Sequence, residues 1–217
     1  MLLGSASKLH LSLKCPASVH LPQEEPPAFV RAAGERGTAI HKELQHNPKP
    51  EHAGYWSVLR EQAFVYNVTS GEAKTLDGTD REYGELKPDD VPGTADCVLG
   101  GFRSFEIVDY KTGKEQYATP PRDNPQLNHL ALCAWRSLFR QATHAALSLQ
   151  FIRATGASYT TSAIVDVWSL SAFSRKLRSC LPKAHSVRSD VDAGKFPKVN
   201  PGEWCRLCHA KCPERIR

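Results

Sequence analysis

The chain lacks the long apolar stretch that a membrane-spanning helix requires. No apolar run in its 217 residues approaches the roughly 20 needed to cross a bilayer. Proline and glycine, at 15 and 14 residues, are at ordinary levels, which excludes collagen-like and low-complexity proteins. Internal repeats are also absent. The hydrophobic fraction of 41% is enough to build a core, so the sequence predicts a single folded domain over 1–217.

A secretory signal is missing as well. The N-terminal stretch is rich in leucine and ends at Cys15, but Lys8, His10 and Lys14 interrupt what should be an unbroken apolar segment. We therefore expect a cytoplasmic protein that is not associated with a membrane, in a compartment where thiols stay reduced. Seven cysteines, an odd number, do not indicate a disulfide framework in that compartment.

Helical and strand patterns alternate along the chain, which predicts an α/β fold with a largely consecutive, partly antiparallel sheet. A hairpin is expected at Gly100-Gly101, and the segment from Ser70 to Pro92 is expected to be irregular. Pro182 can interrupt the last helix. The expected helices are Ser5–Lys14, Ala28–His46, Gln126–Arg140 and Ser171–Ala193, and the expected strands are Glu61–Val68, Val91–Leu99, Ser104–Tyr110, Ala145–Ile152 and Ser162–Trp168.

Two aspartates and a lysine form the most informative pattern. Asp96 lies in the first strand of the expected hairpin and Asp109 in the second, so the two carboxylates can meet at one end of the sheet. Lys111 follows Asp109 by two residues and leaves the strand on the same face. Paired carboxylates offer the hard oxygen ligands that Mg²⁺ or Mn²⁺ prefers, and an adjacent amine stabilises developing charge. This set predicts phosphodiester hydrolysis, although an Asp-x-Lys triplet alone is often only surface charge.

The order of four short motifs carries a resemblance to a known family. The chain contains GTAIH ending at His41, GTAD ending at Asp96, a strand ending in VDYKTG around Asp109, and Gln126 opening a helix. Together they resemble the RecB-like branch of the PD-(D/E)XK nuclease superfamily. The resemblance implies a PD-(D/E)XK core, with a mixed central sheet flanked by helices.

The resemblance also assigns roles to individual residues. His41, Asp96 and Asp109 are expected to bind Mg²⁺ or Mn²⁺, completed by the backbone carbonyl of Tyr110. Lys111 is the expected catalytic lysine.

Two further positions match the family in part. Gln126 corresponds to the glutamine of its Q-x-x-x-Y motif and is expected in the catalytic set, but the tyrosine of that motif is Leu130 here. Glu61, which opens its expected strand, matches a common acid of the family.

Three cysteines, Cys205, Cys208 and Cys212, close the chain at a spacing typical of a metal or cluster site. Zinc would need a fourth ligand, either His209 or a remote cysteine. A [4Fe–4S] cluster would also need four ligands, usually all cysteines, and Cys15 is the remote candidate. The other three cysteines lie in apolar or helical stretches and are expected in the core.

Nucleases of the AddB type and of the CRISPR-associated exonuclease type are similar in this layout, because they pair one N-terminal cysteine with three C-terminal ones around [4Fe–4S]. The N-terminal stretch SKLHLSLKCPAS also resembles the opening of small phage-encoded members. The resemblance therefore implies a cluster held by Cys15, Cys205, Cys208 and Cys212, with zinc as the alternative. It divides the chain into a cluster-contributing segment 1–27, a nuclease core 28–168 and a basic, cysteine-rich segment 169–217.

Positive charge is concentrated at the C-terminal end. Residues 171–217 carry a net charge of +7, against −2 for the rest of the chain. This fits a protein that binds a polyanion at one end, although charge alone better favours an ordinary solvated basic helix. The expected DNA contacts on the last helix are Arg175, Lys176, Arg178 and Lys183.

The preferred interpretation is a metal-dependent DNA exonuclease that acts on DNA ends in recombination, repair or phage DNA processing, in a prokaryotic host or a phage-infected cell. A homo-oligomer is compatible with it. The alternatives are a non-catalytic nucleic-acid-binding module with a C-terminal zinc site, and a nuclease subunit active only with a recombination, helicase or integrase partner.

Overall fold

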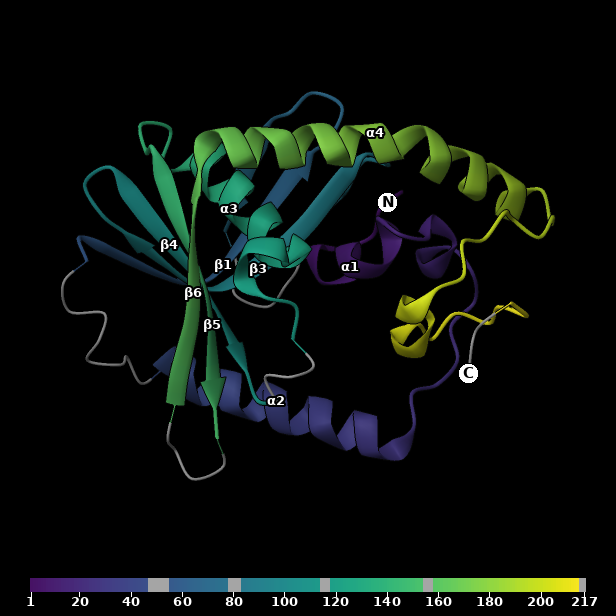
Figure 1. Cartoon of the computed structure of the whole chain (residues 1–217), viewed down its shortest axis with the longest axis horizontal. Coiled ribbons are helices and arrows are strands. Elements are labelled where there is room, and N and C mark those ends of the chain that lie inside the picture. The colour runs from purple at the N-terminus through teal and green to yellow at the C-terminus, as the bar shows by residue number, and fades with distance from the viewer. Residues whose placement is uncertain (47–54, 78–82, 114–117, 154–157, 215–217) are drawn as a thin grey trace.

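The protein has an α/β fold built on a mixed six-stranded sheet with helices on both faces (Figure 1). The structure, a computed structural model, describes residues 1–46, 55–77, 83–113, 118–153 and 158–214. The strands are β1 (Ser57–Asn67), β2 (Ala73–Leu76), β3 (Asp90–Gly100), β4 (Ser104–Lys111), β5 (His144–Ile152) and β6 (Ser158–Asp166). The main helices are α1 (Leu9–Ser12), α2 (Ala28–His46), α3 (Pro125–Ser137) and α4 (Val167–Asp192), with 3₁₀ turns at Ala6–Lys8, Pro16–Val19, Pro121–Asp123 and Glu203–Leu207.

The strand order is β2-β1-β3-β4-β5-β6, and among these pairs only β4 and β5 are parallel. A parallel pair needs a long crossover, and α3 supplies it. The expected mixed, partly antiparallel sheet is therefore confirmed, as is the hairpin that joins β3 to β4.

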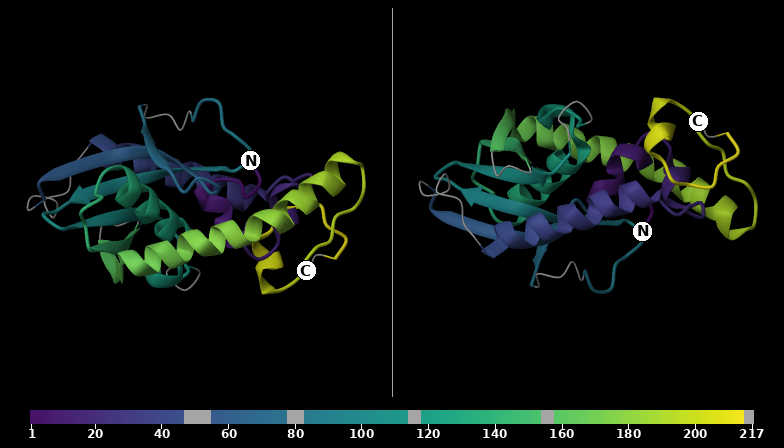
Figure 2. Two further views of the ribbon diagram at one scale, coloured as in Figure 1. Left: turned by 90° about the horizontal axis from the view of Figure 1, so that it is seen from above. Right: turned by 90° about the horizontal axis from the view of Figure 1, so that it is seen from below.

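The main core lies between one face of the sheet and helices α1, α3 and α4. A smaller cluster, containing Cys97, Leu99 and Val108, lies on the opposite face, where α2 runs along the sheet and contributes Leu44 (Figures 1 and 2). Gly93 of β3 allows the N-terminal segment to approach closely, because a Cβ there would lie 2.6 Å from the Cβ of Ala6. The central strands β3 and β4 therefore lie between the N-terminal segment on one face and α2 on the other.

Several local expectations differ from the structure. The expected Ser5–Lys14 helix is a 3₁₀ turn followed by the four-residue α1, and β1 begins at Ser57 rather than Glu61. The segment Ser70–Pro92 contains a short edge strand, β2, which hydrogen bonds to β1 and has too few residues to give a sequence pattern. β6 spans Ser158–Asp166 rather than Ser162–Trp168, because the Asp166 side chain accepts a hydrogen bond of 2.7 Å from the Ser169 amide and begins α4 there. α4 also continues through Pro182, which is exposed, while Leu181 and Ala184 are buried in the core on either side of it.

The chain ends lie side by side. In Figures 1 and 2 the N-terminal segment and the C-terminal segment that follows α4 meet beyond the edge of the sheet. The backbone joins them directly, since the Glu24 amide donates to His209 O at 2.6 Å and the Lys211 amide to Pro22 O at 2.8 Å. Within the described ranges, no helix is long and apolar enough to cross a membrane.

Candidate functional site

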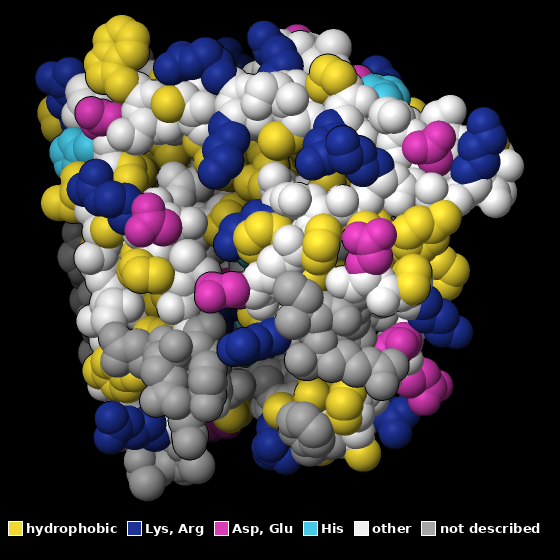
Figure 3. All heavy atoms as spheres, turned by 45° about the vertical axis from the view of Figure 1, so that its right-hand side comes forward, with side chains coloured by type: hydrophobic (Ala, Val, Ile, Leu, Met, Phe, Trp, Pro, Cys, Tyr) yellow, Lys and Arg dark blue, Asp and Glu magenta, His cyan; other side chains and the backbone are white. Residues whose placement is uncertain are grey.

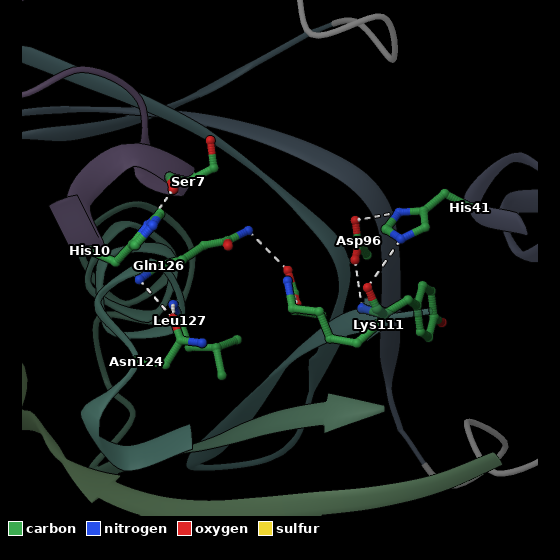
Figure 4. Close-up of polar contacts among 10 residues, drawn as sticks. Ser7, His10, His41, Asp96, Lys111, Asn124, Gln126 and Leu127 are labelled. Carbon is green, nitrogen blue, oxygen red and sulfur yellow. Dashed lines mark hydrogen bonds and ion pairs between the residues drawn. The ribbon is translucent and has the colours of Figure 1, made fainter. Parts of the chain in front are cut away.

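Asp96 and Asp109 lie next to each other on neighbouring strands. Cys97 of β3 pairs with Val108 of β4, so the two aspartates occupy the next opposed positions of the hairpin. Both are buried, with exposed fractions of 6% and 4%. The Tyr110 amide donates to Asp96 Oδ2 at 2.7 Å, which fixes that carboxylate against the neighbouring strand (Figure 4).

His41 reaches this pair from α2. Its Nδ1 lies 3.1 Å from Asp96 Oδ1, and its Nε2 lies 3.1 Å from the carbonyl oxygen of Tyr110 (Figure 4). The contact with the Asp96 carboxylate raises the pKa of His41 above its usual value, against the opposing effect of burial. The helix, β3 and β4 thus bring together the imidazole, the carboxylate and the carbonyl that the family resemblance pairs.

Glu61 completes a triad of ligand atoms. The donor atoms of His41, Glu61 and Asp96 all lie within 4.8 Å of one another. Glu61 has a φ of +46°, in the left-handed region that a non-glycine residue enters at a cost of about 1 kcal/mol or more. Arg60 pairs with Cys97 and Gln62 with Ala95, so Glu61 stands opposite Asp96 in the β1–β3 ladder. The sequence matched Glu61 only through the family resemblance, since the pairing of β1 with β3 is a long-range feature.

Lys111 and Gln126 hold the other carboxylate from two sides. Lys111 Nζ lies 2.5 Å from Asp109 Oδ2, and Gln126 Nε2 donates to Asp109 Oδ1 at 2.9 Å (Figure 4). Burial raises the pKa of Asp109 to about 6, although the positive charge of Lys111 opposes the shift. Lys111 is half-exposed, so its amine faces both the buried carboxylate and solvent.

The first turn of α3 positions Gln126. Asn124 is the N-cap, and its Oδ1 accepts hydrogen bonds from the amides of Gln126 and Leu127. Leu130, at the tyrosine position of the family motif, is fully buried in the core and lies away from the carboxylates. The glutamine of the motif thus contacts the site, whereas the residue at its tyrosine position serves packing.

His10 is a residue near the site that sequence analysis did not identify. It lies on α1, which packs with α3 in the main core, and Figure 4 draws it in the same close-up as Gln126. Burial lowers the pKa of His10, and nearby positive charges, Lys111 among them, lower it further. The N-terminal segment therefore lies on the α3 side of the site, which its sequence gave no reason to expect.

The donor set suits a hard divalent cation. Carboxylates of Glu61, Asp96 and Asp109 provide oxygen, and His41 provides a nitrogen that Mn²⁺ accepts readily. The His41 Nδ1 has the Asp96 carboxylate as its partner within the described part of the chain, at 3.1 Å. Carboxylates and an imidazole this close together are the donor set of a divalent-cation site, so these residues fit a bound metal ion.

The four cysteines of the expected cluster also come together. Cys15, Cys205, Cys208 and Cys212 all line one small apolar void between the chain ends. Backbone amides point at two of the sulfurs, with Asn200 N 3.4 Å from Cys15 Sγ and Gly202 N 3.4 Å from Cys205 Sγ. The described residues that line the void do not include His209, the alternative zinc ligand.

Proximity of the thiols shows in their electrostatics as well. Burial raises the pKa of Cys212, and the neighbouring Cys15 and Cys205 raise it further. The other cysteines, Cys97, Cys133 and Cys180, lie elsewhere in core or helical positions, as expected. The donor chemistry of this void is therefore all sulfur, with amide donors already directed at it.

Comparison with known proteins places the chain in a family. The family model DUF2800, described as "Protein of unknown function", matches residues 55–217. The chain belongs to the DUF2800 family. No curated protein matches it. Among solved structures, the crystal structure of SSO0001 is similar at 13% identity and a TM-score of 0.41, over 88% of this chain and 73% of that one.

The match to the DUF2800 model includes most of the site but not all of it. Glu61, Asp96, Asp109, Lys111 and Gln126 lie within the matched residues, and so do the three C-terminal cysteines. His41 and Cys15 precede them. In this DUF2800 protein, each of the two clusters therefore receives one residue from the part of the chain before the match.

The basic residues expected to contact DNA lie on α4 of this DUF2800 protein. Arg175, Lys176, Arg178 and Lys183 are all exposed, and Figure 3 shows Lys and Arg side chains along its upper edge, where α4 runs. Arg178 has a further role, because its Nε and Nη2 donate to the carbonyls of Val68 and Thr69 at 3.3 and 3.1 Å. It braces the turn that follows β1.

Proposed function

We propose that this protein is a metal-dependent DNA exonuclease with a RecB-like PD-(D/E)XK core. The observation that carries the proposal is the convergence of His41, Asp96, Asp109 and Lys111 at one end of the β3–β4 hairpin, with the Tyr110 carbonyl beside them. A protein that only bound nucleic acid would have no need of two buried carboxylates facing a lysine, since buried charge is costly unless it is used.

The proposed metal ligands are His41, Asp96, Asp109 and the Tyr110 carbonyl, with Glu61 as an additional acid. Bound Mg²⁺ or Mn²⁺ would lower the pKa of a water molecule and neutralise charge on the scissile phosphate. Lys111 is placed to donate hydrogen bonds to the attacking water or to a phosphate oxygen as negative charge develops.

Gln126 has a positioning role in this scheme. Its amide donates to one oxygen of Asp109 at 2.9 Å and leaves the other oxygen directed at Lys111. The Asp109 carboxylate therefore keeps one orientation, in which the positive charge of Lys111 opposes the rise in its pKa.

We also propose that the four cysteines hold a [4Fe–4S] cluster that joins the chain ends. Four sulfur ligands around one void match the preference of such clusters, and amide hydrogen bonds to the sulfurs are a usual means of stabilising them. The cluster would fix the N-terminal segment, which lies on the α3 side of the candidate site. Its role in this proposal is structural.

The proposed substrate is DNA with a free end, in recombination, repair or phage DNA processing. The excess of basic residues on α4 favours a polyanion as the ligand. A recombination, helicase or integrase partner is compatible with this surface.

The test is cleavage of end-labelled DNA by the full chain, purified without oxygen, with Mn²⁺ or Mg²⁺. Asp109→Asn and Lys111→Met should each lower the rate by about a hundredfold or more, because the first weakens a proposed metal ligand and the second removes positive charge that acts at the reacting phosphate. Asp123→Asn and Lys195→Met are matched controls on exposed residues outside the site, and should keep the wild-type rate. Near-normal cleavage by folded Asp109→Asn or Lys111→Met would refute the proposed site.

A further inference from the structure

An open groove of about 790 Å³ lies apart from the candidate catalytic residues. β1, β2 and the loop before β3 form one wall, and the C-terminal part of α3 forms the other. His41, Asp96 and Asp109 do not line it. The proposed catalytic chemistry leaves this groove without a role.

Basic side chains stand on both walls of the groove. Lys74 and Lys87 belong to the strand side, and Arg136 and Arg140 belong to the helix side. All four are exposed, and none forms an ion pair with another described residue. Cations on facing walls are suited to a ligand that carries negative charge along its length.

The two acids of the groove do not balance these charges. Asp90 is buried, and both of its oxygens are occupied, by Asn67 Nδ2 and by the Lys87 amide, each at 2.8 Å. Glu72 is exposed on the rim. Four cations thus face two carboxylates, one of them buried, and the groove carries net positive charge.

The helix wall is ordered in advance. The Arg136 guanidinium lies over the Trp135 ring at 4.5 Å, a cation–π contact that restrains it while its N–H groups stay free. Arg140 Nε donates to the Arg136 carbonyl at 2.9 Å. Restrained donors bind phosphate with a smaller loss of side-chain entropy.

We propose that this groove binds the phosphodiester backbone of a DNA strand, away from the point of cleavage. The inference rests on the proposed function for the identity of the ligand. A single phosphate would contact only one wall, whereas a strand can contact both. The basic surface continues onto α4, because Gly71 lines the groove and Arg178 Nη2 lies 3.5 Å from the position of a Cβ there.

The experiment measures binding without cleavage. A fluorescent single-stranded oligonucleotide is titrated with the full chain in EDTA over a series of salt concentrations, so the result does not depend on catalysis. The groove variant is Lys74→Gln/Lys87→Gln/Arg136→Gln/Arg140→Gln. The control variant, Arg31→Gln/Arg36→Gln/Lys195→Gln/Lys198→Gln, removes the same charge from exposed residues that do not line the groove.

The groove variant should reduce the slope of log affinity against log salt by about 3, since each phosphate contact to a single strand contributes about 0.7. Its affinity at low salt should fall by about tenfold or more, and that of the control by about twofold or less. Equal slopes for the two folded variants, or no oligonucleotide binding by the wild type, would overturn the inference. A mononucleotide is titrated in parallel. A groove variant that loses mononucleotide binding while its oligonucleotide binding is unchanged would overturn the inference too. The proposed function is judged separately, by cleavage in the Asp109→Asn and Lys111→Met variants.

Discussion

His129 makes the stability of the fold sensitive to acid. It lies on α3, has no exposed surface, and sits 6.1 Å from the Tyr66 ring in an edge-on contact. Burial lowers the pKa of His129 from 6.5 to about 4, since a charged imidazole loses its hydration there. In the unfolded chain the same group has its ordinary pKa. Between these two values the unfolded state therefore binds a proton that the folded state does not.

The sign and size of the effect follow from this difference. A lowered folded-state pKa means that the full stability is present above about pH 6.5 and is lost as the pH falls toward 4. At about 1.36 kcal/mol for each pH unit, His129 alone costs about 3 kcal/mol of the free energy of unfolding over that range. Natural domains are stable by only about 5–15 kcal/mol, so the loss is a large fraction.

The assay is urea unfolding followed by circular dichroism at several pH values from neutral to acid. His129→Leu replaces the imidazole with an apolar side chain and so removes the titrating group from the core. The curve of its unfolding free energy against pH should therefore be flatter by about 3 kcal/mol. His144→Gln, which removes an exposed histidine, is the control and should keep the wild-type curve. Parallel curves for the wild type and His129→Leu would refute the reasoning, whatever their separation at neutral pH.

Three further results are expected. Mn²⁺ should support cleavage at least as well as Mg²⁺, and His41→Ala should reduce this preference, because the imidazole is the nitrogen donor; cleavage that survives exhaustive EDTA treatment would contradict the mechanism. Cys15→Ser should lose iron and lower the thermal midpoint as much as Cys208→Ser, whereas Cys180→Ser should keep iron; full iron in Cys15→Ser, with metal lost in His209→Ala, would favour zinc. The salt slope of DNA binding should fall by about 2 in the triple variant Arg175→Gln/Lys176→Gln/Lys183→Gln, and an unchanged slope would place α4 away from DNA. Arg178→Gln should chiefly lower the thermal midpoint, because Arg178 holds two backbone carbonyls.

Much of the fold could be predicted from local patterns. α2 begins and ends at the expected residues, because the prolines before and after it limit a continuous helical segment. The β3–β4 hairpin was predicted from Gly100-Gly101, and with it the proximity of Asp96 and Asp109. β2 could not be predicted, since a four-residue edge strand owes its conformation to β1 rather than to its own side chains.

The parts of the site that depend on backbone geometry could not be predicted from the sequence. The motifs identified His41 and Lys111, but the hydrogen bond from His41 to the Tyr110 carbonyl depends on how α2 crosses the sheet. The left-handed backbone at Glu61 and the position of His10 near the charge of Lys111 arise from long-range packing. Such features carry no periodicity, so a single sequence does not reveal them.

Helix α3 connects the two proposed DNA contacts, the candidate site and the groove, and so sets the distance between them. Gln126 near its start donates to Asp109 of the candidate site, and Arg136 near its end lines the groove. At about 1.5 Å per residue the two positions are separated by about 15 Å along the axis. A strand with about 3.4 Å between nucleotides covers that distance with about four or five of them. Cleavage of oligonucleotides shorter than this should be insensitive to the groove cations yet should still depend on Lys111. The length of α3 would thus set the smallest DNA that can reach both contacts at once.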